Sequence, residues 1–272
     1  MIKRFDSGRD RSTKQFHSLQ HMRGPLSYIG GKTRLAKQIV AMLPAHKTFV
    51  ETFSGGAQVF FHKQPSAVEV LNDLDGEIVN FFRVCQQHPD ELIRYLKNML
   101  VSRKWYELLK VTDPATLTDI QRAARHLYLL KSSFGAMVVK QNYHIHVIQP
   151  PGFNLDKLPE AIAETHKRLA RVQIECLPYE KVLKHYDRPE TLFYLDPPYF
   201  GRSLYRYNLS ADDFAKMADR LANLQGKFIL SLNDVPEVRE IFRQFKIQAV
   251  DLAYSAQPSS GRRYKEVLIT NF

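Results

Sequence analysis

Seven short runs of β-type residues, separated by amphipathic segments, constrain the fold of this chain more than any other feature. The amphipathic segments carry apolar residues at helical spacing, as Leu35, Ile39 and Leu43 do ahead of Pro44. Strands that alternate with helices predict an α/β fold, in which a mostly parallel sheet of seven strands is covered by helices on both faces. The runs lie at 48–53, 67–71, 172–176, 191–195, 227–232, 247–252 and 265–270.

A long gap between the second and third runs breaks this alternation. Helical patterns around 78–84, 91–100 and 119–131 occupy the gap, and an alternating run follows at 137–148. A helical subdomain with a hairpin, inserted into the main domain, fits this pattern, and an elaborated crossover without a function of its own is the alternative. The predicted parts are a flexible basic tail at 1–23, a main domain at 24–85 and 166–272, and the insert at 86–165.

The chain carries 39 Lys and Arg residues against 28 Asp and Glu residues, a formal net charge of +11. An excess of this size favours a polyanionic partner, most often a nucleic acid. The charge is uneven, because residues 83–172 hold 14 basic and 8 acidic residues, whereas residues 48–82 hold 1 and 5. The acidic segment suits a cation or a diol better than a phosphate. A basic protein without a specific anionic partner is the alternative.

Cysteine content and hydropathy exclude several classes of protein. Cys85 and Cys176 stand far apart without neighbouring metal ligands, which argues against a disulfide framework or a zinc site and predicts a reducing, cytoplasmic setting. The alternating His144 and His146 are interpreted as surface residues of a hairpin, so no metal is expected. The sequence contains no apolar run of membrane-spanning length and no signal-peptide pattern, so no membrane partner is expected.

The most specific motif is Asp196-Pro197-Pro198-Tyr199, which directly follows the apolar run at 191–195. In open α/β sheets, ligands bind beyond the carboxyl ends of strands. Each proline fixes its own φ and lacks an N–H donor, so the loop presents the Asp196 carboxylate and the Pro197 carbonyl as acceptors. Two acceptors beside the Tyr199 ring suit a planar heterocycle that bears an exocyclic amine. A turn that only ends a strand is the alternative.

Six motifs in a fixed order resemble the Dam-like DNA adenine methyltransferases, the D12 class with alpha-type motif order, which depend on S-adenosylmethionine. The resemblance covers nearly all of residues 25–272 and includes the long insert between the second and third strands. It implies a seven-stranded Rossmann-like methyltransferase sheet with an inserted target-recognition subdomain. The motifs lie at 25–32, 49–56, 72–75, 196–199, 231–234 and 266–272.

The resemblance implies a site for S-adenosylmethionine, with S-adenosylhomocysteine as the product. Lys32 stands at a predicted helix N-terminus, a position that suits a carboxylate. The family uses the positions of Tyr28 and Lys32 for the methionine end of the cofactor. Glu51, at the end of the first strand, would offer its charge to the ammonium group.

Other parts of this predicted site follow the first, second and third strands. Gly55 and Gly56 would let the backbone approach the cofactor closely, and Asp73 stands where an acid commonly accepts ribose hydroxyls. The family often has an acid where this chain has Pro178, so the adenine ring would be held by stacking on Tyr179. The predicted cofactor-binding residues are Tyr28, Lys32, Glu51, Phe53, Gly55, Gly56, Asp73, Tyr179 and Asp196.

The resemblance also implies methylation of the exocyclic 6-amino group of adenine in double-stranded DNA. Such a base cannot react inside the duplex, so it would be flipped out and stacked on Tyr199. Asp196 and the Pro197 carbonyl would accept the amine N–H bonds, which makes these two residues, Pro198 and Tyr199 the predicted catalytic residues. The predicted DNA-binding residues, which would contact phosphates, are Arg122, Arg125, Lys131 and Lys140.

Further expectations concern assembly and alternative functions. We expect a monomer that could act beside a restriction endonuclease, and the segment 131–154 does not match enzymes that read GATC. A Walker-type phosphate loop would need glycine where Leu26 stands, which argues against an ATPase. A catalytically silent DNA-binding regulator would not need the intact Lys32, Asp73 and Asp196. Methylation of RNA adenine or of the cytosine amine uses similar chemistry and stays open.

Overall fold

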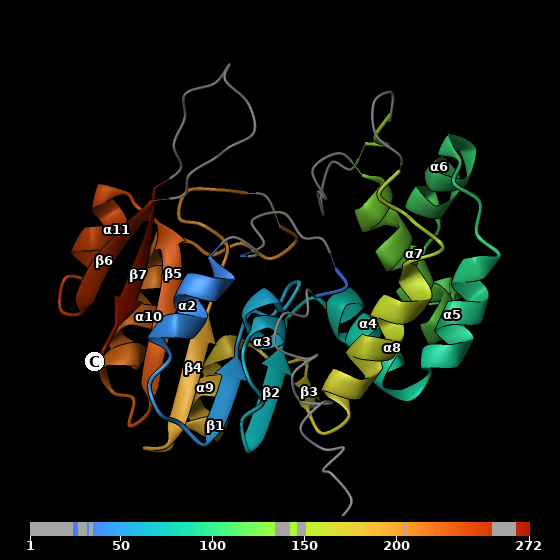
Figure 1. Cartoon of the computed structure of the whole chain (residues 1–272). Coiled ribbons are helices and arrows are strands. Elements are labelled where there is room, and N and C mark those ends of the chain that lie inside the picture. Colours follow the sequence, from blue (N-terminus) through green and yellow to red (C-terminus); the bar gives the residue numbers. More distant parts are fainter. Residues whose placement is uncertain are drawn as a thin grey trace, which may run out of the picture.

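A computed structural model describes residues 24–26, 32, 35–133, 142–145, 151–203, 205–251 and 265–272 (Figure 1). The predicted basic tail at 1–23 and most of the predicted hairpin at 137–148 lie outside the described residues. None of the helices in the described part of the chain is long and apolar enough to cross a membrane.

The centre of the protein is a seven-stranded sheet with the order β3-β2-β1-β4-β5-β7-β6. The first five strands in that order are parallel, and β7 runs antiparallel to both β5 and β6. The predicted α/β sheet is therefore confirmed, and each strand lies within one or two residues of its predicted bounds. The strands are β1 (Thr48–Glu51), β2 (Val68–Asn72), β3 (Gln173–Glu175), β4 (Thr191–Leu195), β5 (Lys227–Asn233), β6 (Lys246–Asp251) and β7 (Lys265–Thr270).

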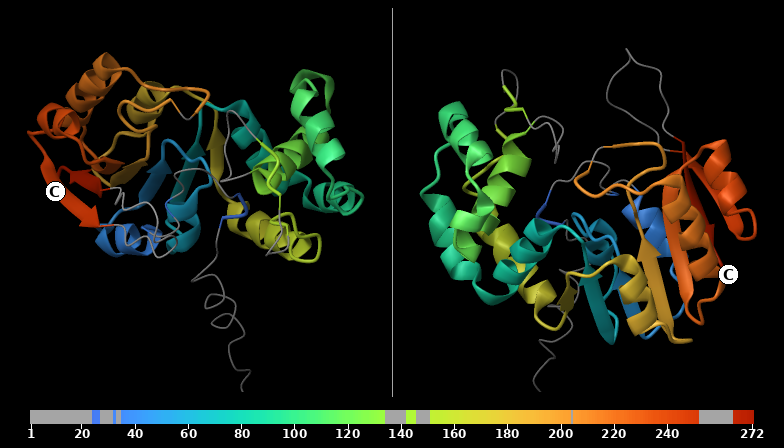
Figure 2. Two further views of the ribbon diagram at one scale, coloured as in Figure 1. Left: turned by 90° about the horizontal axis from the view of Figure 1, so that it is seen from above. Right: turned by 180° about the vertical axis from the view of Figure 1, so that it is seen from behind.

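Helices cover both faces of the sheet, as Figure 2 shows. Buried side chains alternate between the faces, so that Phe49 packs on one side and Val50 on the other. One face is covered by α2 (Ala36–Met42), α3 (Gln58–His62) and α4 (Gly76–Gln87). The other face is covered by α9 (Tyr179–Tyr186), α10 (Ala211–Ala222) and α11 (Pro236–Ile241). Two faces buried in this way explain why the strands read as continuous apolar runs.

The insert forms a helical layer beside α4, at the β3 end of the sheet (Figure 1). One buried cluster runs from Phe81 and Phe82 of α4 to Leu127 of α7, so the insert shares its hydrophobic core with the main domain. The domain boundaries drawn from the sequence therefore stay a prediction. The helices of this layer are α5 (Pro89–Lys97), α6 (Arg103–Val111), the short 3-10 helix η2 (Pro114–Thr116), α7 (Asp119–Ser132) and α8 (Leu158–Leu169).

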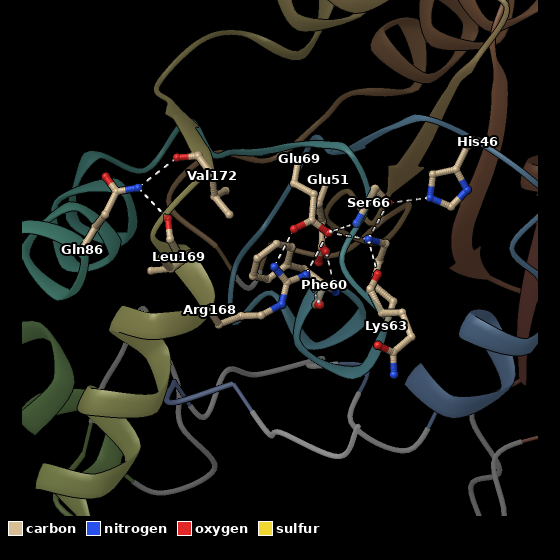
Figure 3. Close-up of polar contacts among 11 residues, drawn as sticks. His46, Glu51, Phe60, Lys63, Ser66, Glu69, Gln86, Arg168, Leu169 and Val172 are labelled. Atoms are coloured by element: carbon tan, nitrogen blue, oxygen red, sulfur yellow. Dashed lines mark hydrogen bonds and ion pairs between the residues drawn. The ribbon is translucent and has the colours of Figure 1, made fainter. Parts of the chain in front are cut away.

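Buried charges fix α8 against the edge of the sheet (Figure 3). Arg168, near the end of α8, contacts Glu69 of β2 with an Nη1–Oε2 distance of 2.5 Å, and Lys63 pairs with the same carboxylate. The Arg168 guanidinium also lies 3.7 Å from the centroid of the Phe60 ring. Gln86 of α4 donates to the carbonyls of Leu169 and Val172 at 2.7 and 2.9 Å, which satisfies the last carbonyl of α8 and one in the loop that follows.

Replacement of Arg168 tests this anchor. Arg168→Leu leaves the buried Glu69 carboxylate with Lys63 as its remaining cation, and removal of one partner of a buried pair is strongly destabilising. We expect the free energy of unfolding to fall by about 3 kcal/mol in urea titrations. The control is Arg243→Leu, because the Arg243–Glu240 pair is exposed and should contribute less than about 1 kcal/mol. Equal losses in the two variants would contradict the anchoring role.

Candidate active site

The carboxyl ends of β1, β2 and β4 meet at one edge of the sheet, where the described residues line a cavity. Parallel strands that lie side by side bring their C-terminal loops together, as the sequence predicted for this edge. Tyr28, which the resemblance placed here, lies outside the described residues. The predicted residues that line the cavity are Lys32, Glu51, Phe53, Gly55, Gly56, Asp73, Tyr179, Asp196 and Pro198.

The loop between β1 and α3 wraps its backbone around one side of the cavity. Gly55 has φ +47° and Ala57 has φ +50°, so two residues of this loop adopt the left-handed conformation. For alanine this conformation is strained, and such strain often occurs where a backbone must approach a ligand. The Gly55 N–H donates to Oδ2 of Asp73 at 2.8 Å, which ties the loop to the end of β2.

Asp73 presents a half-buried carboxylate at the carboxyl end of β2. Its Oδ1 accepts the Asp75 N–H at 2.9 Å, and burial raises its pKa to about 6. Next to it, the Asn72 amide donates to the carbonyls of Thr52 and Leu177 at 2.9 and 3.0 Å and so holds the three neighbouring loops together. The carboxylate is therefore rigidly placed and faces the cavity as an acceptor.

Glu51 is buried, with an exposed fraction of 2%, and lines the cavity. Its Oε2 accepts the Phe60 N–H at 2.9 Å. Burial raises the pKa of Glu51 well above its ordinary value, and the nearby Asp196 charge acts in the same direction. A carboxyl group in this setting gains from a bound cation, because the cation offsets the cost of burying the negative charge.

Two aromatic rings form another wall of the cavity. Phe53 and Tyr179 lie with their ring centroids 5.6 Å apart at an interplanar angle of 33°. Pro178 directly precedes α9, and its hydrocarbon side chain offers no acceptor to a ligand at this position. This wall suits a flat heterocycle bound by stacking.

The Asp196 carboxylate belongs to a network of charged and hydroxyl groups beside the cavity. Lys32 Nζ lies 2.7 Å from Asp196 Oδ1, 3.5 Å from Glu266 Oε2 and 3.1 Å from the Tyr199 hydroxyl. The Tyr199 hydroxyl donates to Glu266, and Ser231 Oγ donates to Asp196 Oδ1 at 2.9 Å. Burial lowers the pKa of Lys32, but the charges of Asp196 and Glu266 outweigh it and leave the pKa raised. The lysine is therefore a cation at neutral pH.

Three members of this neighbourhood had no role in the sequence prediction. Ser231 and Glu266 lie in motifs that the resemblance quoted, but nothing in the sequence shows that both side chains reach the Asp196 loop. Tyr205 follows the same loop and lines the cavity. The features of the sequence that could have pointed to Ser231 and Glu266 are a polar residue within the apolar strand β5 and an acid at the second position of β7.

The predicted DNA-binding residues of the insert have different surroundings. Arg122 Nη2 lies 2.5 Å from Glu77 Oε1, and Lys131 is half-buried, with its pKa lowered by burial. Arg125 is buried, and its guanidinium donates to the carbonyls of Leu109 and Lys110 at 2.6 and 3.3 Å. The geometry thus gives Arg125 a structural role and does not favour it as a phosphate contact. Lys140 lies outside the described residues.

A cavity at the carboxyl ends of parallel strands, with a carboxylate after β2 and an Asp-Pro-Pro-Tyr loop after β4, defines the class of α/β enzymes that bind nucleoside-type cofactors at this edge. The family model of the D12 class N6 adenine-specific DNA methyltransferases matches residues 28–256. The chain therefore belongs to this family.

Known relatives agree with that family over almost the whole chain. The Type II methyltransferase M1.LlaDCHI of Lactococcus lactis subsp. cremoris is 26% identical, over 90% of this chain and 94% of its own length. The Type II methyltransferase M.CviBI of Paramecium bursaria Chlorella virus NC1A is 24% identical, over 92% of this chain and 98% of its own length. The DNA adenine methylase of Escherichia coli K12 is 23% identical, over 88% of this chain and 91% of its own length.

Among solved structures, the SAM-dependent methyltransferase from Agrobacterium tumefaciens is 12% identical, with a TM-score of 0.40. That match covers 88% of this chain and 59% of the other. At this level of similarity, the assignment of the fold rests on the strand order described above.

The buried charge of Glu51 has a measurable consequence for stability. Because burial raises the pKa of Glu51, the folded protein binds this proton more tightly than the unfolded chain, and stability is lost as pH rises. Glu51→Gln keeps an acceptor for the Phe60 N–H and removes the charge. We expect a higher free energy of unfolding than wild type at about pH 8. The difference should vanish below the ordinary glutamate pKa of 4.5, and a difference independent of pH would contradict this account.

Proposed function

We propose that the chain transfers a methyl group from S-adenosylmethionine to the exocyclic 6-amino group of an adenine that is flipped out of duplex DNA at a specific site. The observation that carries this proposal is the Asp196 carboxylate in the lining of a cavity that Asp73, Glu51 and the Phe53–Tyr179 pair also line. Membership of an adenine-specific DNA methyltransferase family supports it.

The chemistry of the cavity walls fits each part of this cofactor. The Phe53–Tyr179 pair would stack with the adenine ring, and Asp73 would accept the ribose hydroxyls. The buried Glu51 would pair with the ammonium group of the cofactor, and Lys32 would bind the carboxylate of its methionine end. When bound, S-adenosylmethionine supplies an electrophilic sulfonium methyl group.

The residues around Asp196 would orient and polarise the target amine. Lys32 and Ser231 both engage Oδ1 of Asp196, and within the described residues Oδ2 accepts no hydrogen bond. Oδ2 and the Pro197 carbonyl are therefore the proposed acceptors for the two amine N–H bonds, with Tyr199 stacked on the base. The nitrogen gains positive charge as its new bond to carbon forms, and a fixed carboxylate stabilises that charge.

The remaining predictions concern DNA and partners. The insert at 86–165 is proposed to read the target sequence, and basic residues there and in the 1–23 segment to contact phosphates. The relatives named as Type II methyltransferases support a restriction–modification setting, in which an endonuclease would share the target. We propose a monomer that acts on DNA in the cytoplasm.

The proposed reaction is tested by transfer of labelled methyl groups to unmethylated duplex DNA, followed by digestion to nucleosides. We expect the label in N6-methyl-2′-deoxyadenosine, whereas label in a methylated 2′-deoxycytidine, or transfer to RNA alone, would contradict the proposal. Asp196→Asn should slow transfer by about 100-fold or more, because the amide lacks the negative charge of the carboxylate. Its DNA affinity should stay within about threefold of the wild-type value. The control is Asp212→Asn, an exposed acid on α10, which should keep wild-type activity.

The pKa of Asp73 predicts how cofactor binding depends on pH. Because burial raises this pKa to about 6, the carboxylate that would accept the ribose hydroxyls is protonated below that pH. We expect calorimetric Kd values to be constant above about pH 7 and to rise by up to about tenfold per pH unit below pH 6. Asp73→Asn should bind weakly and lose this inflection. An inflection that persists in Asp73→Asn would assign the titration to another group.

A further inference from the structure

We infer that Glu266 is a positioning residue for methyl transfer. Its carboxylate would pair with Lys32 when Asp196 binds the target amine, and it would hold the Tyr199 ring in place through the ring hydroxyl. This inference rests on the proposed function, because it concerns the same transfer step. Neither the family motifs nor the comparisons give Glu266 a role.

Glu266 reaches this position through the antiparallel strand β7. It lies opposite Asn233 of β5 in the sheet register, and only 4% of its surface is exposed. The described residues that line the cavity include Lys32 and Asp196 but not Glu266. The carboxylate therefore lies behind the cavity wall and would act on the reaction through Lys32 and Tyr199 rather than by contact with a ligand.

The hydrogen-bond roles around the Tyr199 hydroxyl are fixed by chemistry. The Lys32 ammonium can only donate, so the hydroxyl oxygen accepts from Lys32 at 3.1 Å. The hydroxyl proton then goes to Glu266 Oε1, because a carboxylate only accepts. With one contact on each side, the far end of the ring that would stack on the base is held in place.

The charges are arranged so that one cation serves two acids. Lys32 Nζ lies 2.7 Å from Asp196 Oδ1 but 3.5 Å from Glu266 Oε2, which accepts no hydrogen bond among the described atoms although it is buried. An unsatisfied buried charged oxygen is costly, so a short shift of Nζ toward Glu266 recovers a contact there. Lys32 can thus leave Asp196 without losing a counter-ion.

This shift matters because Lys32 competes with the target amine for Asp196. While Nζ lies on Oδ1, it withdraws negative charge from the carboxylate that must stabilise the developing cation. A lysine drawn toward Glu266 leaves Asp196 a stronger acceptor. Without the Glu266 charge, Lys32 would stay on Asp196, and the amine would meet a partly neutralised acceptor.

The test compares single-turnover methyl transfer at saturating DNA and cofactor in wild type and Glu266→Gln. Glutamine keeps an acceptor for the Tyr199 hydroxyl and removes the charge. We expect the rate to fall by about tenfold or more, while the Kd values for DNA and S-adenosylmethionine stay within about threefold. Glu266→Asp retains the charge and should give a rate between those of wild type and Glu266→Gln.

The matched control is Glu175→Gln, because Glu175 of β3 also accepts a tyrosine hydroxyl, that of Tyr186 at 2.8 Å, away from the cavity. It should transfer at the wild-type rate. A Glu266→Gln rate equal to that of this control, or a loss explained entirely by weaker binding, would overturn the inference. If wild type itself forms no N6-methyl-2′-deoxyadenosine, the proposed function fails first, which separates the two failures.

A second variant tests the same contact without altering the strand, in case β7 does not tolerate the amide. Tyr199→Phe keeps the ring and removes the hydroxyl that bridges Lys32 and Glu266. We expect transfer to slow by about threefold or more, with unchanged DNA affinity. A wild-type rate would show that the hydroxyl contact does not position the ring and would overturn that part of the inference.

Discussion

The ion pairs of Lys32 with Asp196 and Glu266 are the interactions on which the arrangement of this site depends. Asp196 and Glu266 approach each other from strands that are far apart in the sequence, and Lys32 lies between them with little access to solvent. Two carboxylates this close would repel strongly in a medium of low dielectric constant. The lysine makes their proximity tolerable and, through Tyr199, links the charge balance to the ring that would hold the base.

The sheet explains how such distant groups meet. Parallel strands place the ends of β2, β1 and β4 at one edge, which brings Asp73, Glu51 and Asp196 around one cavity. The reversed strand β7 then inserts between β5 and β6, and its first residues lie at the same edge. The insert extends the hydrophobic core beyond β3, so the proposed recognition layer and the main domain share one core.

Much of this architecture follows from sequence pattern. The apolar runs predicted all seven strands, because both faces of the sheet are buried, and the Asp-Pro-Pro-Tyr motif predicted the edge where the cavity lies. The role of Glu266 could not be predicted, because it depends on the register of β7 against β5. The surroundings of Arg125 could not be predicted either, because its guanidinium donates to two carbonyls inside the insert, and its contact with phosphates stays a prediction.

In the proposed reaction, Asp196, Pro197 and Tyr199 receive a flipped adenine beside the cavity that would hold the cofactor. The most direct measurement is a crystal structure with S-adenosylhomocysteine and a short duplex that contains the target site. We expect the adenine amine nitrogen at about 3 Å from Asp196 Oδ2 and from the Pro197 carbonyl, with Lys32 moved toward Glu266. An adenine that stays stacked in the duplex, or one held by other residues, would contradict the proposal.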